Sequence, residues 1–290
     1  MIKRFASIIL IILSALCISA CTSLGKNSSS TFSIQFIDVG QGDSALVECD
    51  GNYMLIDGGD EAAGDTVYSV LEENGIQHLN ILVMSHMHAD HIGGLEKALT
   101  YATTIDLTLS NTTDGETAVF NKVEHELAID GANITVPHEG DKYQLGSAEI
   151  EVIDASAASD NDSLVLMVTY GKTKFLFTGD IEDEAQTRVS DKYANDKDKE
   201  YKVDLIKMPH HGSASPNSYD GTGSLYRFIR TFKPDYAVIS VGKGNMYGHP
   251  HKETLDLLDQ ADVKVYRTDL NGNITVRSDG KSVKVDCEKQ

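Results

Sequence analysis

Basic residues are scarce in this 290-residue chain: 25 Lys and Arg stand against 44 Asp and Glu, a formal net charge of −19. A strongly acidic surface repels polyanions, so we expect no broad basic groove that binds nucleic acid tightly and nonspecifically. After residue 21 the chain also lacks the long apolar runs that a transmembrane pore needs, which excludes DNA transport by the chain itself. The sequence shows no internal repeat.

Cysteine is also rare, with four in the chain. Cys49 and Cys287 each end a run that predicts a strand. An external location would permit a disulfide between them, whereas the alternative is two unrelated small apolar residues. The sequence leaves both open, because it does not give the separation of the two side chains.

The N-terminus predicts an export signal. A basic start, Met1 to Arg4, precedes an apolar segment, 5–16, that is too short to span a bilayer comfortably, and Ile18-Ser19-Ala20-Cys21 follows. This pattern is typical of a bacterial lipoprotein signal, residues 1–20, cut before a lipidated Cys21. An ordinary secretory signal or a true anchor helix are the alternatives.

The remaining chain is expected to divide into two parts. Residues 21–31 are rich in Ser, Lys and Asn and predict a flexible tether, and residues 32–290 predict a single catalytic domain. Removal of the predicted signal takes away Lys3 and Arg4, which changes the formal net charge from −19 to −21. We therefore expect an extracytoplasmic protein held on the outer face of a bacterial membrane by its lipid anchor.

The segment from Ser85 to Gly94 places three imidazoles and a carboxylate in six residues, directly after an apolar run, 81–84. The run predicts a buried strand and the residues from Ile92 onward a helix, so the ligand candidates lie on the turn between them. We expect two neighbouring metal ions. His86 and His88 would bind one of them, and Asp90 and His91 would bind the other. Nitrogen and oxygen ligands without thiolate suit zinc, manganese or iron.

Two other apolar runs end in polar side chains of the same kind. Asp180 follows the run 175–177 and could bridge both ions, and the pair His210 and His211 follows the run from Val203, so that one of the two could be a further ligand. Two ions about 3.5 to 4 Å apart lower the pKa of a bound water toward about 7 and neutralise an oxyanion. The chemistry predicted is hydrolysis by a metal-bound hydroxide, with Ser213 available to bind a phosphate oxygen.

A last histidine cluster lies in Tyr247-Gly248-His249-Pro250-His251. The flanking Gly and Pro constrain His249, which could present a proton donor to a leaving alkoxide. The alternative is a loop that only starts the helix expected over 254–260. Three other histidines stand alone and are expected at the surface: His78, His125 and His138.

These residues resemble the metallo-β-lactamase superfamily, and within it the hydrolase domain of ComEC-type competence proteins in a free-standing form. The resemblance covers about residues 32–286, and its motifs are 36–45, 55–59, 85–94, 162–166, 176–180, 209–213, 241–251 and 266–269. It implies an α/β fold, an αββα sandwich with the ions at one end of the paired sheets, and hydrolysis of a phosphodiester or another ester.

The chain departs from the superfamily pattern at one place. Many members carry a further metal-binding histidine about twenty residues before the strand-end aspartate, but here the segment 159–163 reads Ser-Asp-Asn-Asp-Ser. Water, Asn161 or Asp162 would then complete the coordination of one ion. Asn161 could also contact the substrate. Asp57 is expected to order the ligand turns from behind, without binding metal.

The remaining elements follow from apolar periodicity. Strands are expected at 32–38, 44–49, 53–57, 105–109, 148–153, 164–170, 174–177, 204–207, 236–240, 263–266 and 282–287, with a helix at 65–74. Gly40 to Asp43 resembles a phosphate loop but lacks the following Lys, so a tight turn is expected. Because the surface is acidic, a phosphodiester substrate would have to be attracted locally, by the metal ions and by Lys207, Arg267 or Lys243.

The sequence thus predicts a surface-anchored hydrolase with two divalent ions, zinc or manganese, that cleaves phosphodiesters, single-stranded DNA among them, in the manner of a DNA-uptake nuclease. Asp90, with the other ligands, and His249 would carry the reaction. Two alternatives stand beside it. One is a hydrolase of a wall-linked phosphoester, a lactone or a β-lactam, and the other is a non-catalytic, metal-containing accessory lipoprotein in DNA uptake.

Overall fold

The structure is a computed structural model that describes residues 31–115, 117–194, 201–214 and 223–289. The predicted signal, the predicted lipidation site Cys21 and nearly all of the predicted tether lie outside the described residues. Within the described ranges, no helix combines the length and apolar character needed to cross a membrane.

One sheet has eight strands in the order β15-β14-β1-β2-β3-β4-β5-β6. Strands β1, β2 and β3 form an antiparallel meander, and β4, β5 and β6 continue from β3 in parallel. The bounds in chain order are β1 Phe32–Phe36, β2 Ala45–Cys49, β3 Asn52–Ile56, β4 His78–Met84, β5 Thr104–Ser110, β6 Ile134–Thr135, β14 Ile274–Ser278 and β15 Val283–Cys287.

The second sheet has seven strands in the order β13-β12-β11-β10-β9-β8-β7. Strands β7 to β10 are antiparallel neighbours, and β10, β11, β12 and β13 run parallel. The bounds are β7 Lys142–Leu145, β8 Ala148–Asp154, β9 Val165–Tyr170, β10 Thr173–Phe177, β11 Leu205–Lys207, β12 Tyr236–Ile239 and β13 Lys264–Arg267.

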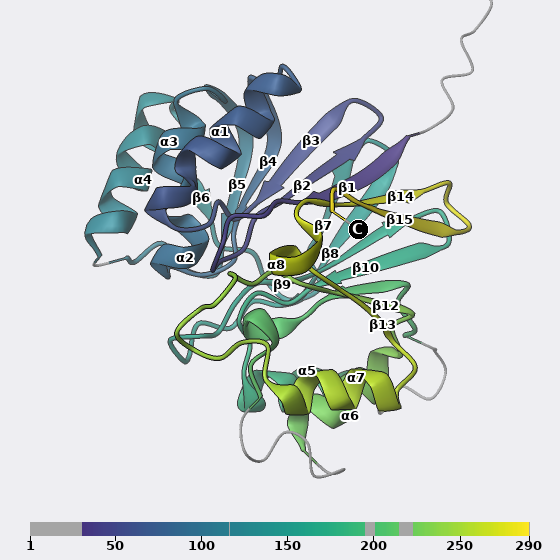
Figure 1. Ribbon diagram of the computed structural model, residues 1–290. Coiled ribbons are helices and arrows are strands. Elements are labelled where there is room, and N and C mark those ends of the chain that lie inside the picture. The colour runs from purple at the N-terminus through teal and green to yellow at the C-terminus, as the bar shows by residue number, and fades with distance from the viewer. Residues whose placement is uncertain (1–30, 116, 195–200, 215–222, 290) are drawn as a thin grey trace, which may run out of the picture.

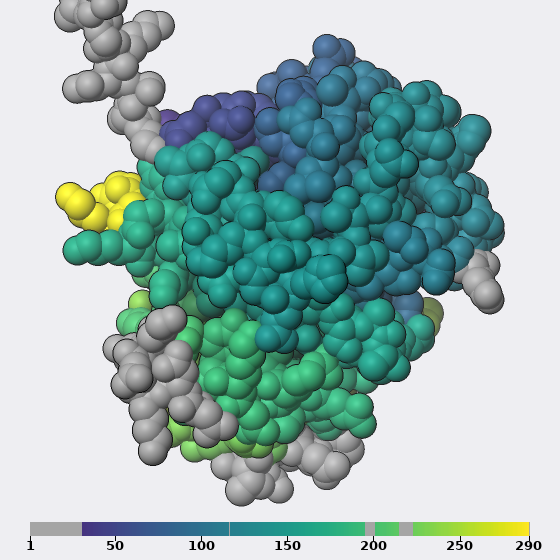
Figure 2. Space-filling view, turned by 180° about the vertical axis from the view of Figure 1, so that it is seen from behind, coloured from purple at the N-terminus to yellow at the C-terminus, as the bar shows by residue number. Residues whose placement is uncertain are grey.

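Helices cover the outer faces of both sheets, which produces four layers (Figure 1). Figure 1 shows one group of helices outside the eight-stranded sheet: α1 Gly64–Glu73, α2 Ala89–Ile92, α3 Leu95–Leu99 and α4 Ala118–Ile129. The other group lies outside the seven-stranded sheet, and comprises α5 Asp183–Ala194, α6 Ser224–Phe232 and α7 Lys252–Gln260. The short helix α8, Thr268–Asn271, lies between the sheets' C-terminal strands. From behind, the purple and blue N-terminal segments lie at the top, the teal middle of the chain covers the centre, and green segments lie below it (Figure 2).

The core between the two sheets follows from strand alternation. Strand β1 buries Phe32, Ile34 and Phe36, whereas the intervening side chains are only partly buried. The Phe32 ring stacks between the rings of Tyr170 and Phe175 on the opposite sheet, each at a centroid distance of 4.9 Å. Because offset-stacked rings add packing energy to the burial of apolar surface, this cluster joins the sheets at the end remote from the polar loops.

The expected fold is confirmed as two sheets with helices outside them, and every predicted strand is present to within three residues. The sequence did not indicate β6, β7 or β14, which are short or partly exposed. Cys49 and Cys287 are free thiols, so the disulfide left open by the sequence does not form here. Cys49 pairs with Phe32 at one end of β1, whereas Cys287 pairs with Ile274, the partner of Phe36, at the other end.

Candidate metal centre

Polar side chains gather where neighbouring parallel strands end. Strands β3 and β4 are parallel, as are β10, β11 and β12, so their carboxyl ends share an edge of each sheet. Asp57 follows β3, the segment from Ser85 to His91 follows β4, and Asp180 follows β10 after two residues. His211 and His249 come from the loops after β11 and β12. The sheet topology, and not chain proximity, brings these side chains together.

Four of the predicted ligands form one compact group: Asp90, His91, Asp180 and His211 each offer a ligand atom within 4.8 Å of the others. His91 Nε2 lies 3.2 Å from Asp180 Oδ1, and His211 Nε2 lies 3.2 Å from Asp90 Oδ2 and 3.5 Å from Asp180 Oδ2. Asp90 and His91 lie inside the short helix α2, which begins at Ala89 and therefore earlier than the expected Ile92.

His86 and His88 lie beside this group. The ring of His86 is 4.5 Å from that of His88 and 4.2 Å from that of His91, measured between centroids. Three atoms in this cluster are buried without a hydrogen-bond partner: His86 Nε2, His91 Nε2 and Asp180 Oδ1. Buried polar atoms are rarely left unpaired. Imidazole nitrogens and a carboxylate oxygen oriented toward one another are the donor set that divalent metals take, so the residues fit the metal that the sequence predicts.

The other nitrogen of each buried imidazole is held from behind. Asp57 Oδ2 accepts from His91 Nδ1 at 2.8 Å, and the same carboxylate accepts from the backbone N–H and the hydroxyl of Ser85. His211 Nδ1 contacts the Ser240 carbonyl at 3.0 Å and Asp43 Oδ1 at 3.3 Å. These contacts orient the Nε2 atoms toward the centre, as the outer partners of metal-binding histidines do. Asp57 therefore lies where the sequence predicted.

The loop after β11 resolves which of the paired histidines joins the group. Both have left-handed backbones, with φ of 47° at His210 and 53° at His211, conformations that cost roughly 1 to 3 kcal/mol for such residues. This backbone points the two rings differently: His211 belongs to the ligand group, whereas His210 Nδ1 bonds Glu182 Oε1 at 2.9 Å and its Nε2 is 3.8 Å from Asp180.

Electrostatics favour a cation at the centre. Burial opposes a charge on His91 and His211, but the surrounding carboxylates outweigh it. Asp180 and Asp57 raise the pKa of His91 well above its ordinary value, and Asp180 and Asp43 raise the pKa of His211 to about 9. A pocket that holds protons this firmly attracts divalent cations in their place.

Two other ligand candidates, His86 and Asp90, are already in the protonation state that metals bind. Burial and the neighbouring charge of His91 lower the pKa of His86 well below its ordinary value, so its imidazole is neutral. Burial would raise the pKa of Asp90, but the hydrogen bond from His211 and the charge of His91 lower it to about 2. Neutral imidazole and ionised carboxylate need lose no proton to coordinate a metal.

Lys207 is a buried cation beneath the centre. Its side chain is 4% exposed, its Nζ forms an ion pair with Asp43 Oδ2, and it lies 4.0 Å from Asp180 Oδ1. Burial would raise the pKa of Asp43, but the charges of Lys207 and His91 lower it below its ordinary value. The expectation that Lys207 attracts substrate is therefore wrong, because its ammonium is enclosed and held by Asp43. The sequence missed this role of Asp43, whose only signal was its position after Gly40-Gln41-Gly42.

We expect Lys207→Met to lower the free energy of unfolding by about 3 to 5 kcal/mol, because it leaves a buried carboxylate without its partner. The surface pair of Lys142 with Glu149 provides the control, since Lys142→Met should cost less than about 1 kcal/mol. Urea denaturation measures both. Adding Asp43→Asn to Lys207→Met should restore part of the loss, and equal stability of the two lysine variants would contradict the buried pair.

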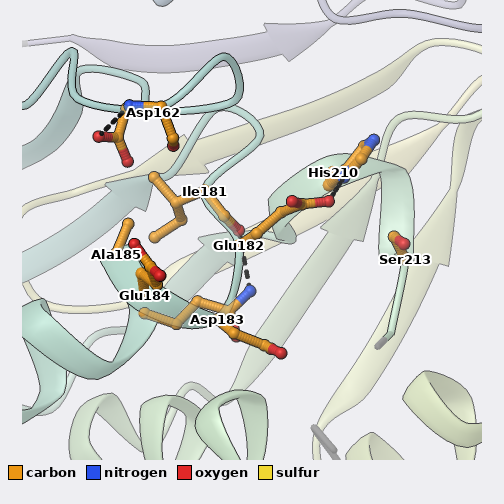
Figure 3. Close-up of a pocket in the computed structure, with 10 residues that line it drawn as sticks. Asp162, Ile181, Glu182, Asp183, Glu184, Ala185, His210 and Ser213 are labelled. Carbon is orange, nitrogen blue, oxygen red and sulfur yellow. Dashed lines mark hydrogen bonds and ion pairs between the residues drawn. The ribbon is translucent and has the colours of Figure 1, made fainter. Parts of the chain in front are cut away.

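The substrate-binding candidates lie at the rim. Ser213 lines a pocket of about 400 Å³ together with His210, and carboxylates form much of its wall: Asp162, Glu182, Asp183 and Glu184 (Figure 3). In Figure 3 Glu182 reaches toward His210, and Ser213 lies on the far side of His210 from the carboxylates. The Ser213 N–H donates to the His210 carbonyl at 2.8 Å, so its hydroxyl is the group left for a substrate. Arg267 is held by two bonds to Asp269, whereas Lys243 is exposed.

His249 lies over the centre. Its ring is 5.4 Å from that of His210 and 6.2 Å from that of His211, and its Nδ1 is buried without a partner. Burial and the neighbouring histidines lower the pKa of His249 to about 4, so its ring is neutral at pH 7. Asn245 holds the loop, because its Nδ2 donates to the His249 carbonyl and its Oδ1 accepts from the His249 N–H.

Gly42 permits a close backbone approach to the ligand turn. A Cβ at this position would lie 2.3 Å from the carbonyl oxygen of Asp90, and its φ is +142°. We expect Gly42→Ala to displace Asp90 and lower bound metal, measured by elemental analysis, at least about tenfold at limiting metal. Gly40→Ala is the matched control: its φ is +76°, but nothing lies within 4 Å of the added Cβ. Equal metal loss in both would assign the effect to backbone strain alone.

Fold and site together define a protein of the metallo-β-lactamase fold with His and Asp groups that could bind a metal. Solved structures with this fold agree. They include the metallo-β-lactamase fold protein YhfI from Bacillus subtilis, 12% identical with a TM-score of 0.55 over 86% of this chain and 100% of that one. A putative metal-dependent hydrolase from Parabacteroides distasonis is 17% identical with a TM-score of 0.52, and the match covers 83% of this chain and 94% of that one.

The chain belongs to the family described as anti-Pycsar protein Apyc1, whose model matches residues 29–201, more than half of its length. The resemblance to ComEC-type competence proteins is also confirmed. ComE operon protein 3 of Bacillus subtilis is 31% identical over 271 residues, 86% of this chain and 33% of that protein. Competence protein ComA of Neisseria gonorrhoeae is 28% identical over 240 residues, which are 81% of this chain and 30% of that protein. This chain therefore spans about a third of the curated relatives it matches.

Proposed function

We propose that this protein is a metal-dependent hydrolase whose substrate is a phosphodiester. The observation that carries the proposal is a set of buried ligand atoms without a hydrogen-bond partner, on His86, His91 and Asp180, at the carboxyl ends of parallel strands. His91 Nε2 lies 3.2 Å from Asp180 Oδ1, and the His86 and His91 ring centroids are 4.2 Å apart. His211, Asp90, His91 and Asp180 would hold one ion, and His86 and His88 with a shared Asp180 the other. Such ions, zinc or manganese, activate a water and neutralise charge at phosphorus.

The chain's own residues would then position the substrate and its leaving group. The His249 ring is neutral, so it offers an N–H for a hydrogen bond to the leaving oxygen, and the Ser213 hydroxyl is available to a phosphate oxygen. Asp57 and Asp43 fix the imidazoles from behind, which removes the need for reorganisation during the reaction.

The substrate is expected to be small or single-stranded. The acidic pocket beside His210 and the net charge of −19 both repel a long polyanion, and Lys207 is enclosed. Competence-protein relatives support a substrate related to DNA, so we place single-stranded DNA and short phosphodiesters first. Cleavage of DNA should depend only weakly on salt, because few Lys and Arg contact phosphates.

A substrate panel tests the proposal. Steady-state rates are measured with zinc and with manganese on single-stranded DNA, bis-p-nitrophenyl phosphate, a phosphocholine ester and a β-lactam. Turnover of the phosphodiesters supports the assignment. Turnover of the β-lactam or a carboxylic ester alone overturns it, and DNA binding without any turnover favours the accessory-protein alternative.

The proposal extends to location. We propose that residues 1–20 are a lipoprotein signal and that Cys21 carries the lipid anchor that holds residues 32–290 outside a membrane, the support being the sequence Ile18-Ser19-Ala20-Cys21. Cys21→Ser should then release the protein from membranes and abolish fatty-acid labelling, while metal content stays unchanged. Wild-type protein that takes up no fatty acid and fractionates with the cytoplasm would contradict the anchor.

A further inference from the structure

The two halves of the proposed metal centre have unequal donor sets. One half has Asp90, His91 and His211 besides the shared Asp180. The other has only His86 and His88, because the segment from Ser159 to Ser163 carries no histidine. Whether the second half binds an ion as firmly as the first therefore depends on whether another side chain of this protein supplies a further metal ligand there.

The loop between β8 and β9 is fixed against the turn that carries His86 and His88. The Leu164 N–H donates to the Ser85 carbonyl at 2.8 Å, and Ser163 Oγ lies 3.3 Å from His86 Nδ1. Asn111 Nδ2 bonds the carbonyl oxygens of two loop residues, Ser156 and Asp162. The loop is therefore held where a side chain from it can reach the centre.

Asp160 is the loop residue whose carboxylate reaches a predicted ligand. Its Oδ2 lies 3.2 Å from His88 Nε2, the ring atom that would bind the ion. In residues 31–115, 117–194, 201–214 and 223–289, this histidine is the one contact recorded for the Asp160 carboxylate, which is 94% exposed. It is thus free to rotate toward an ion without breaking an internal bond.

The spacing matches that of two ligands on one ion. Donor atoms each about 2.1 Å from an ion, at angles of 90° to 109°, lie about 3.0 to 3.4 Å apart. The pairs of the other half show this separation, with 3.2 Å between His91 Nε2 and Asp180 Oδ1 and between His211 Nε2 and Asp90 Oδ2. The 3.2 Å between Asp160 and His88 is the same.

Asp162, an alternative from the sequence, does not reach the centre. Its Oδ2 accepts from the Ser156 hydroxyl and from the N–H groups of Ala158 and Ser159, and its Oδ1 lies 3.4 Å from Arg188. This carboxylate shapes the loop that carries Asp160, and its expected role as a ligand is wrong. For Asn161 the recorded contact is through its backbone carbonyl, which accepts from Ser163.

We propose that Asp160 replaces the missing superfamily histidine as the protein ligand that completes the ion held by His86 and His88. Each ion would then have two imidazoles and two carboxylates, with Asp180 shared. Exchanging an imidazole for a carboxylate moves this half toward manganese, because carboxylates suit harder ions. The exposure of Asp160 makes this ion the more readily exchanged of the two. The inference rests on the proposed metal centre.

Metal binding, independent of turnover, tests it. The full-length protein is stripped with a chelator and titrated with manganese, and free Mn²⁺ is followed by its paramagnetic resonance signal. Wild type should bind two ions, and Asp160→Asn should weaken one of them at least about tenfold, since even outer partners contribute 10- to 100-fold. Asp160→His should keep two ions but shift preference toward zinc. Asp114→Asn, an exposed carboxylate after Asn111, is the control and should match wild type.

A second background identifies the ion affected. Asp90→Asn removes a ligand of the other half, so this variant should retain the ion of His86 and His88, and Asp90→Asn/Asp160→Asn should bind none tightly. If the double variant still binds one ion with the affinity of Asp90→Asn, Asp160 is not a ligand and the proposed centre stands. If wild type binds no metal, the proposed centre itself fails.

Discussion

Asp90→Asn should abolish turnover, by at least about a thousandfold, and leave the fold intact. Asp90 lies 3.2 Å from His211 Nε2, and its side chain is one-third exposed at 34%, so no buried core is disturbed. An amide is a neutral and weaker metal ligand than a carboxylate. Removal of the charge also removes the one carboxylate that the proposed centre assigns to this half alone.

Three measurements distinguish loss of metal from loss of the fold in Asp90→Asn. Elemental analysis should show less bound metal, circular dichroism should show unchanged secondary structure, and kcat should fall on every phosphodiester. His88→Ala should behave similarly. His138→Ala is the control, because His138 is 92% exposed and its ion pair is with Asp141, which is not a residue of the centre. Full activity of metal-free Asp90→Asn would overturn the hydrolase mechanism.

The second large effect is expected at His249. His249→Ala should lower kcat by about 10²- to 10⁴-fold for an alkyl phosphodiester while bound metal stays unchanged, since in the proposed function the ring would donate to the leaving oxygen without coordinating metal. The loss should be much smaller for bis-p-nitrophenyl phosphate, whose phenolate leaves without help. Equal losses on both substrates would show that His249 only shapes the site. His249→Gln keeps a side-chain N–H and should recover part of the rate.

The pH profile follows from the pKa of His249. Because that pKa is lowered to about 4, the ring is protonated below pH 4 and neutral above it. The His249-dependent part of the rate should therefore stay constant from pH 5 to 8. A fall through pH 6.5, the ordinary value for histidine, would instead indicate an imidazolium donor.

Much of the centre was predictable because its ligands follow apolar strands. The turn from Ser85 to His91 was recognisable from its spacing, and Asp180 from its place after the run 175–177. The pair His210-His211 could not be resolved in this way. Which ring enters the group depends on two consecutive left-handed residues, and their conformation is imposed by the neighbouring loops.

Buried charge was the feature that the sequence concealed. Lys207 was expected to attract the substrate as one of the few basic residues, but its side chain points between the sheets toward Asp43, 164 residues earlier in the chain. Whether a lysine meets solvent or a buried carboxylate is decided by the packing of distant strands, which residue type does not report.

The sequence by itself determined the strands, the α/β class and most of the candidate metal ligands, because apolar periodicity and ligand spacing are local properties of the chain. Only the tertiary structure decided which candidate ligands lie in one group, that His211 and not His210 joins it, that Asp43 pairs with Lys207, and that Asp160 reaches His88. These contacts join residues that are far apart in the chain, and two packed sheets with parallel strand ends bring them within a few ångströms of one another.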